Sequence, residues 1–203
     1  MRILYHHRTL GDGAEGIHVK EMVNAFRRLG HEVKVAALIG EATDSSSRKQ
    51  RRWTRLARLM PGFVYELGEL AYNLKGYATL GRELQAFRPD FIYDRYVSYN
   101  YSAVGLGRKH RVPVILEVNS PYSSQRQTFD EKVYFKGLIR RFERRICRDA
   151  SRVIVVSTPL KSFLASIGVP AERIVVMPNG VDPEAFHPGI DGGAVRSRLG
   201  LDG

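Results

Sequence analysis

The sequence predicts an α/β fold, a doubly wound parallel sheet that forms a single domain. Short runs rich in branched and aromatic residues alternate with longer segments of helical periodicity. The runs are apolar enough for strands with both faces covered, which is typical of parallel sheets. With 203 residues, the chain is long enough to bury one core without disulfides or a metal ion.

The first forty residues predict a strand-helix-strand unit. A strand is expected over residues 2–6, a loop over 8–16, a helix after it, and a second strand over 31–38. The helix is predicted by apolar residues three and four positions apart, and Gly30 is a natural stop for it. Its apolar positions are Val19, Met22, Val23, Phe26 and Leu29.

A second helix is predicted from about Gly62 to Phe87, after a basic insertion at about residues 40–62. It ends before Pro89, because the residue that precedes a proline is disfavoured in helical conformation. The side predicted to be buried carries Leu67, Leu70, Leu74, Tyr77 and Leu84.

The rest of the chain repeats the alternation. Strands are expected over 91–95, 113–118, 152–156 and 174–177, and helices over about 99–109, 130–149 and 158–167. In a sheet of this kind the ligand crevice lies at the carboxyl ends of the strands. The loops that follow the strands are therefore the places where functional residues are expected.

The net charge of +11 suggests a nucleic acid, an anionic membrane surface or a phosphorylated ligand. Nucleic acid is not expected, because neither interleaved surface aromatics nor a recognition-helix motif is present. The single cysteine, Cys147, excludes an internal disulfide and a cysteine-cluster zinc site, and no other metal site is expected. No segment has the length of a membrane span or of a signal-peptide core, so a cytoplasmic protein is expected.

Gly11–Gly16 matches the pattern G-x-G-x-x-G between a strand and a helix. Dinucleotide binding is disfavoured, because four residues separate the motif from the strand and because Asp12 and Glu15 carry negative charge towards a pyrophosphate. A loop that admits a ligand to the free N–H groups of the helix is favoured, and a plain connecting loop stays open. His18, at the start of the helix, either binds that ligand or caps and packs.

Two stretches hold much of the positive charge. Residues 48–58 contain six cations and no acid, and residues 136–148 contain six cations and Glu143. The second has a buried apolar stripe and a solvated arginine face, whereas the first resembles an amphipathic helix with less to pack against. Binding of the first to anionic lipid at the inner membrane face is one hypothesis and an ordinary solvated helix is the other. The candidate membrane-surface residues are Arg51, Arg52, Trp53 and Arg55.

Several motifs in this order and spacing resemble family 4 glycosyltransferases over essentially the whole chain. The resemblance implies half of a GT-B fold, which has two Rossmann-like domains with the active site between them. Transfer in this family retains the anomeric configuration and usually needs no metal ion. The motifs are Gly16-Ile-His-Val19, Leu29-Gly-His-Glu-Val33, Arg88-Pro-Asp-Phe-Ile-Tyr93, Arg152-Val-Ile-Val-Val-Ser157, and Ile174-Val-Val-Met-Pro-Asn-Gly-Val-Asp182 with Phe186-His-Pro188.

The resemblance implies that residues 1–188 are the acceptor-side, N-terminal domain and that residues 189–203 lead towards a donor-binding domain. The family's E-x7-E donor motif has no counterpart after Asp182. The parent chain is therefore expected to be an enzyme and this chain alone to transfer no sugar. The implied partners are a nucleotide-sugar, which is a substrate rather than a cofactor, and a sugar, lipid-linked or small-molecule acceptor.

Many family members carry a His-Asp pair after the strand that begins here at Pro113, and this sequence has Asn119 at the equivalent position. By resemblance, Asn119 contacts the transferred sugar, and Glu117 is the second catalytic candidate. An asparagine donates and accepts hydrogen bonds but does not titrate. A stand-alone Rossmann nucleotide-binding module and a basic membrane-surface adaptor without catalysis are the alternatives. The candidate substrate-binding residues are Gly13, Gly16, His18, Arg95, Arg126, Asn179 and Gly180.

Overall fold

The computed structural model describes residues 1–8, 13–37, 62–121, 134–184 and 187–201. These residues contain a six-stranded sheet in the order β2-β1-β3-β4-β5-β6, with every pair of neighbours parallel. The prediction of a doubly wound parallel sheet is confirmed. The strands are β1 (Arg2–His7), β2 (Glu32–Ala37), β3 (Phe91–Arg95), β4 (Val114–Val118), β5 (Arg152–Val155) and β6 (Ile174–Val176).

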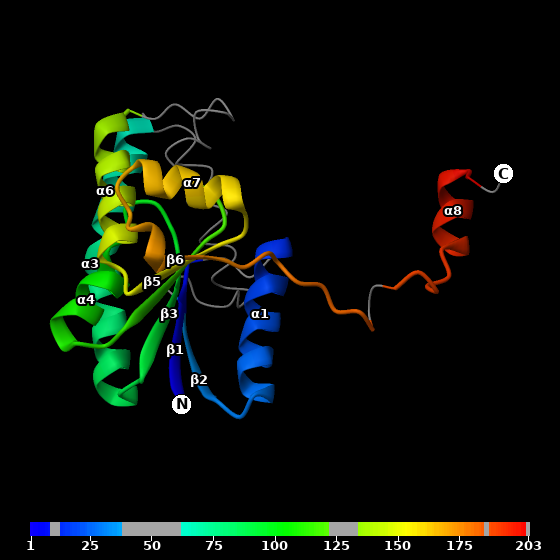
Figure 1. The fold of residues 1–203 in the computed structure, drawn as a ribbon, viewed down its shortest axis with the longest axis horizontal. Coiled ribbons are helices and arrows are strands. Elements are labelled where there is room, and N and C mark those ends of the chain that lie inside the picture. The colour runs from blue at the N-terminus through cyan, green and yellow to red at the C-terminus, as the bar shows by residue number, and fades with distance from the viewer. Residues whose placement is uncertain (9–12, 38–61, 122–133, 185–186, 202–203) are drawn as a thin grey trace.

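Helices cover both sides of this sheet. Helix α1 lies on one side, and α3, α4 and α6 lie on the other (Figure 1). Each crossover packs its helix back onto the sheet, as expected for right-handed strand-helix-strand units. The helices are α1 (Gly13–Arg28), α3 (Gly62–Phe87), α4 (Ser102–His110), α6 (Lys136–Asp149), α7 (Thr158–Ser166) and α8 (Gly193–Leu199), with a 3₁₀ turn over Ala171–Arg173.

Successive apolar side chains of β1, β3, β4 and β5 enter different cores, because strand residues alternate between the two faces. Ile3, Tyr5 and Tyr93 pack with Val19 and Val23 of α1. The residues between them on the strands, including Leu4 and Ile92, belong to the larger core under α3 and α4. The same alternation decides which polar side chains meet at the carboxyl ends of the strands.

Helix α1 begins at Gly13, so the prediction of a loop up to Gly16 is wrong. Gly16 is buried in the first turn and His18 lies in the second turn, rather than opening the helix. The glycines suggest a loop because each weakens a helix by roughly 1 kcal/mol relative to alanine. Packing of Val19 and Val23 against the sheet outweighs this preference.

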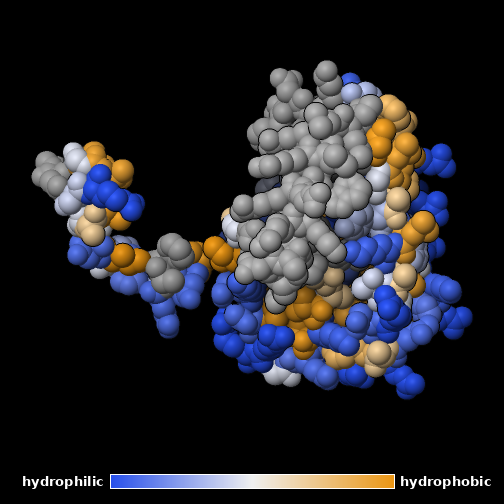
Figure 2. Space-filling view, turned by 180° about the vertical axis from the view of Figure 1, so that it is seen from behind, coloured by the Kyte–Doolittle hydropathy of each residue, from blue (hydrophilic) through white to orange (hydrophobic). Residues whose placement is uncertain are grey.

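The predicted buried side of α3 is wrong at three of its five positions. Leu67, Leu74 and Tyr77 are 49%, 76% and 37% exposed, whereas Glu66 and Glu69 are 2% and 5% exposed. Leu84 is buried as predicted, and Leu70 is partly buried. The carboxylates of Glu66 and Glu69 face inwards because the interior offers them hydrogen-bond donors. Figure 2 shows that hydrophobic side chains do lie at the surface of the protein, among hydrophilic ones.

Two other helix boundaries differ from the prediction. Tyr99 has a left-handed backbone (φ 62), and α4 begins only at Ser102. Helix α6 begins at Lys136, and residues 130–133, where its start is predicted, lie outside the described residues. Its predicted stripe and arginine face are confirmed, since Ile139 and Ile146 are buried and the arginines are exposed.

The segment after β6 leads away from the sheet, and α8 lies apart from it (Figure 1). Residues 177–184 are exposed along their whole length. Helix α8 falls in the predicted linker 189–203 and buries none of its residues. Within the described ranges, no helix is both long enough and apolar enough to cross a membrane.

Candidate functional site

A polar cluster centred on Glu117 lies where β3 and β4 end and α1 begins. The carboxylate Oε1 of Glu117 lies 2.8 Å from Nε2 of His18 and accepts a hydrogen bond of 2.6 Å from Nδ2 of Asn119. Its Oε2 accepts a hydrogen bond of 2.9 Å from the hydroxyl of Tyr93. Glu117 is only 3% exposed, so both carboxylate oxygens are satisfied inside the protein.

The strand register brings the remaining members together. Arg95 is paired with Glu117 in the parallel β3–β4 ladder, and its Nη1 lies 3.6 Å from Oε1 of Glu117. Tyr5 is paired with Tyr93 in the β1–β3 ladder, and their rings stack with centroids 5.0 Å apart. Three adjacent strands and one helix therefore build the cluster, at the crevice edge expected for this fold.

The electrostatics of the cluster keep its carboxylate charged and its phenols neutral. Burial acts to raise the pKa of Glu117, but the hydrogen bond and charge of His18, the amide of Asn119 and the charge of Arg95 together lower the pKa below its ordinary value. Burial and the neighbouring Glu117 charge raise the pKa of Tyr93 and of Tyr5. Glu117 is therefore only an acceptor at neutral pH, and Tyr93 stays a donor.

A second polar pair lies on the opposite face of the sheet. Nδ1 of His6 is 2.6 Å from Oδ1 of Asp94, and the two residues are 1% and 2% exposed. Burial raises the pKa of Asp94, and the charge and hydrogen bond of His6 offset only part of this effect. In the described part of the chain, Nε2 of His6 is buried without a hydrogen-bond partner.

Helix α3 supplies two buried carboxylates to the edge of the sheet where the strands have their carboxyl ends. Glu66 accepts hydrogen bonds from the hydroxyl of Tyr99 and from the backbone N–H groups of Tyr134 and Phe135. Nη2 of Arg8 lies 3.5 Å from Oε1 of Glu69, and the guanidinium of Arg8 lies over the ring of Tyr72 on α3. These contacts tie the end of β1 and the start of α6 to α3.

Sequence reasoning did not predict the buried interactions of His6, Asp94, Glu66 and Glu69. For Glu66 and Glu69 a signal existed, because they share a helical face with Leu80 and Leu84, which are buried. A carboxylate on an apolar stripe indicates a buried polar interaction. For His6 and Asp94 the signal was weaker: adjacent strands placed a base and an acid at the same register.

Four of the predicted site residues are brought together by the structure. His18, Arg95, Glu117 and Asn119 all belong to the cluster centred on Glu117. Glu117 is predicted as a catalytic residue, but its burial and full hydrogen bonding place it behind His18 and Asn119. Its carboxylate contacts other residues of the cluster and does not face solvent.

Of the remaining predicted residues, those that the structure describes do not join this cluster. Gly16 is buried in the first turn of α1, and Gly13 is exposed at its start. Asn179 and Gly180 are exposed in the segment that leads away from the sheet (Figure 1). The predicted residues that lie outside the described residues are Arg126, Arg51, Arg52, Trp53 and Arg55.

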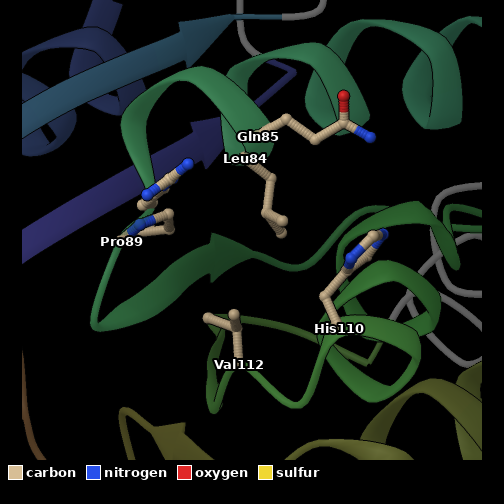
Figure 3. Close-up of a pocket in the computed structure, with 6 residues that line it drawn as sticks. Leu84, Gln85, Pro89, His110 and Val112 are labelled. Atoms are coloured by element: carbon tan, nitrogen blue, oxygen red, sulfur yellow. The ribbon is translucent and has the colours of Figure 1, made fainter.

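A hollow of about 370 Å³ lies at the other edge of the sheet. Leu84, Pro89 and Val112 line it, with Gln85 and His110 beside them (Figure 3). Pro89 and Val112 precede β3 and β4, so the hollow faces the amino ends of the strands, away from Glu117. Among the described residues, no group of three His, Cys, Asp or Glu side chains is arranged to hold a metal ion.

Three solved structures share this architecture. The Anabaena protein Alr3699/HepE in complex with UDP-glucose is 16% identical with a TM-score of 0.59, over 100% of this chain and 50% of that one. Sucrose-phosphate synthase from Thermosynechococcus elongatus is 14% identical with a TM-score of 0.65, over 98% and 52%. UDP-GlcNAc 2-epimerase from Neisseria meningitidis bound to UDP-GlcNAc is 12% identical with a TM-score of 0.55, over 87% and 45%.

This chain therefore spans about half the length of the solved structures it matches. At these identities the likeness shows the fold, which a sucrose-phosphate synthase and a UDP-GlcNAc 2-epimerase share. No curated protein matches the sequence. The protein-family model named Glycosyltransferase Family 4 matches residues 15–185. That match includes both the helix that carries His18 and the strand that carries Glu117, and it covers most of the chain. The chain belongs to Glycosyltransferase Family 4.

Proposed function

We propose that this chain is the acceptor-side domain of a retaining glycosyltransferase that uses a nucleotide-sugar donor. Membership of Glycosyltransferase Family 4 over residues 15–185 carries the proposal. The polar cluster at the carboxyl ends of β3 and β4 supports it, because hydrogen-bonding side chains at this edge suit a sugar with many hydroxyl groups. One solved structure with the same fold holds UDP-glucose.

In this proposal the second domain, which binds most of the donor, faces the carboxyl edge of the sheet. Asn119 contacts the transferred sugar, with His18 beside it. The N-terminus of α1, with Gly13 and Gly16, approaches the donor diphosphate, because free N–H groups at a helix start favour anions. Arg126 contributes to the acceptor side, and Asn179 and Gly180 shape the hinge towards the second domain.

The test is sugar transfer by the complete gene product and by the 203-residue chain. Each is incubated with UDP-, GDP- and ADP-hexoses and a panel of acceptors, and the release of nucleoside diphosphate is measured. We expect the complete protein to transfer sugar and the 203-residue chain to transfer none. The anomeric configuration of the product, determined by NMR, is expected to match that of the donor.

Three results would contradict the proposal. Transfer by the 203-residue chain alone overturns its dependence on a second domain, and an inverted product overturns retention. Tight binding of NAD or FAD by the 203-residue chain in calorimetry supports a stand-alone nucleotide-binding module instead. Asn119→Ala in the complete protein is the matched variant, and its turnover should fall. A positioned hydrogen-bonding group is worth about 2–4 kcal/mol of transition-state stabilisation.

A further inference from the structure

Helix α3 exposes a stripe of apolar side chains to solvent. Leu74 is 76% exposed, Leu67 is 49% exposed and Phe63 is 43% exposed. Since they are spaced four and seven positions apart, they share one face of the helix, with the exposed Ala71 and Ala78 beside them. In Figure 2 a band of hydrophobic side chains runs down the right-hand side of the molecule, with hydrophilic groups along its outer edge. A contiguous apolar patch at the surface is typical of a binding surface.

This apolar stripe lies beside α6. The ring of Phe63 is 6.3 Å, between centroids, from the ring of Tyr134, just before α6 begins. Further along both helices, Leu70 of α3 packs against the cluster that contains Ile139 of α6. The two helices lie next to each other in Figure 1. The apolar stripe of α3 and the exposed face of α6 therefore form one continuous surface.

The exposed face of α6 is positively charged. The only two acidic residues of the helix do not offset this charge on the face, because Glu143 is 1% exposed and Asp149 is at the last position. Among the described residues, Arg145 is the one member of the face that pairs with a carboxylate, that of Asp149 at 3.6 Å. The exposed cations of the face are Lys136, Arg140, Arg141, Arg144, Arg145 and Arg148.

The stability of α6 does not explain this arrangement. Four of the cations follow one another at intervals of four residues from Lys136 to Arg148, and like charges at this spacing weaken a helix. Lys136 is also the first residue of the helix, where the helix dipole disfavours a positive charge. An anionic partner would relieve both effects, so the face indicates a ligand of negative charge.

We infer that the apolar stripe of α3 and the cationic face of α6 together dock the chain onto an anionic lipid bilayer. A bilayer supplies both partners at once, because its headgroups attract the cations and its hydrocarbon accepts the leucines. A soluble polyanion would leave Leu67 and Leu74 in water, and a second copy of this chain would bring two positive faces together. The surface is separate from residues 48–58, and it does not depend on the transfer of a sugar.

The first test measures sedimentation of the 203-residue chain with vesicles of phosphatidylcholine, with and without an equal part of phosphatidylglycerol. One variant reverses three charges on α6, and its matched control makes the same change of net charge on α1, on the other side of the sheet (Figure 1). Residues 48–58 are unchanged in both. The α6 variant is Arg140→Glu, Arg141→Glu and Arg148→Glu, and the α1 control is Lys20→Glu, Arg27→Glu and Arg28→Glu.

We expect the wild type to bind the anionic vesicles and the α6 variant to lose roughly a hundredfold in partition coefficient, because each cation near an anionic surface accounts for about fivefold. The α1 control should lose only a few-fold. Equal losses in the two variants would mean that the binding surface lies elsewhere, and they overturn the inference. A wild type that binds no anionic vesicles overturns it as well.

The second test measures whether the apolar stripe enters the bilayer. Leu74→Trp is compared with Leu29→Trp, at a position of α1's end that is 72% exposed, each in a chain whose single tryptophan is removed by Trp53→Phe. Both sites are exposed, so both variants are expected to fold. We expect the fluorescence of the tryptophan at position 74 to shift to shorter wavelength and to be quenched by brominated lipid, and that at position 29 to do neither. Absence of quenching at position 74, or equal quenching at both positions, overturns the inference.

The third test separates a bilayer from a soluble polyanion. Binding of the wild type and of Leu74→Gln to polyglutamate and to duplex DNA is measured beside binding to the anionic vesicles. We expect Leu74→Gln to lower the partition into vesicles by roughly tenfold, about the loss for one buried leucine, and to leave any binding to the polymers unchanged. Binding to a polymer together with vesicle binding that Leu74→Gln does not lower overturns the inference in favour of a soluble acidic partner.

Discussion

Glu66 offers the sharpest test of the polar interior under α3. It comes from the first turns of that helix, is 2% exposed, and accepts hydrogen bonds from residues 33, 68 and 69 positions away along the sequence. Two of the donors are the backbone N–H groups of Tyr134 and Phe135, just before the first residue of α6. Glu66 therefore anchors the segment that leads into α6, from a position on another helix.

The expected loss of stability depends on which of the three hydrogen-bond donors water can reach once the side chain of Glu66 is truncated. Tyr134 is 49% exposed, so the two backbone N–H groups of this short segment can be rehydrated in Glu66→Ala. The hydroxyl of Tyr99 cannot, because Tyr99 is 0% exposed. Each hydrogen bond to a charged acceptor contributes about 1.5–3 kcal/mol. Since these contributions are not additive, we expect Glu66→Ala to lower the free energy of unfolding by about 3 kcal/mol.

The assay is urea unfolding of the 203-residue chain followed by circular dichroism. Glu83→Ala is the matched control on the same helix, because its 2.6 Å pair with Lys34 is partly exposed and such surface pairs are worth about 0–1 kcal/mol. The loss in Glu66→Ala corresponds to a fall in Tm of roughly 6–12 °C for a chain of this size. The stability of Glu66→Gln, which retains an acceptor but loses the charge, should lie between those of Glu66→Ala and Glu83→Ala. If Glu66→Ala is no less stable than Glu83→Ala, the argument that Glu66 anchors the segment before α6 is wrong.

Two further predictions concern charge. The pKa of Glu117 is lowered from its ordinary value of 4.5, so its contribution to stability is complete above that value and is lost as the pH falls through the lower pKa of the folded state. The difference in unfolding free energy between the wild type and Glu117→Gln should therefore be largest near neutral pH and shrink below 4.5; a difference independent of pH would refute this. The basic segment 48–58 should sediment with anionic vesicles, because each cation near such a surface contributes about 1 kcal/mol. Binding should fall with salt and on changing Arg51, Arg52 and Arg55 to glutamate, whereas equal binding to neutral vesicles, or none to either, would leave the segment as an ordinary solvated helix.

The sequence alone determined the order of the strands and of the main helices up to β6. Alternation of apolar runs with helical segments predicted all six strands that the structure describes, because burying apolar surface on both faces of a parallel sheet leaves a strong local signature. It also placed Glu117 and Asn119 at the carboxyl end of β4 and His18 near the start of α1. Parallel strands bring such ends to one edge, so part of the cluster was predictable from topology.

Only the tertiary structure decided what those residues do. The sequence does not show that Glu117 is buried behind His18 and Asn119, because its contacts come from residues 24 and 99 positions away. Nor does it show that Glu66 and Glu69 face inwards while Leu67 and Leu74 are exposed. Helical periodicity assigns apolar residues to the core by default, since a charge is costly to bury. That cost is offset here by donors from Tyr99, Tyr134 and Phe135, and such partners exist only once distant segments have been brought together.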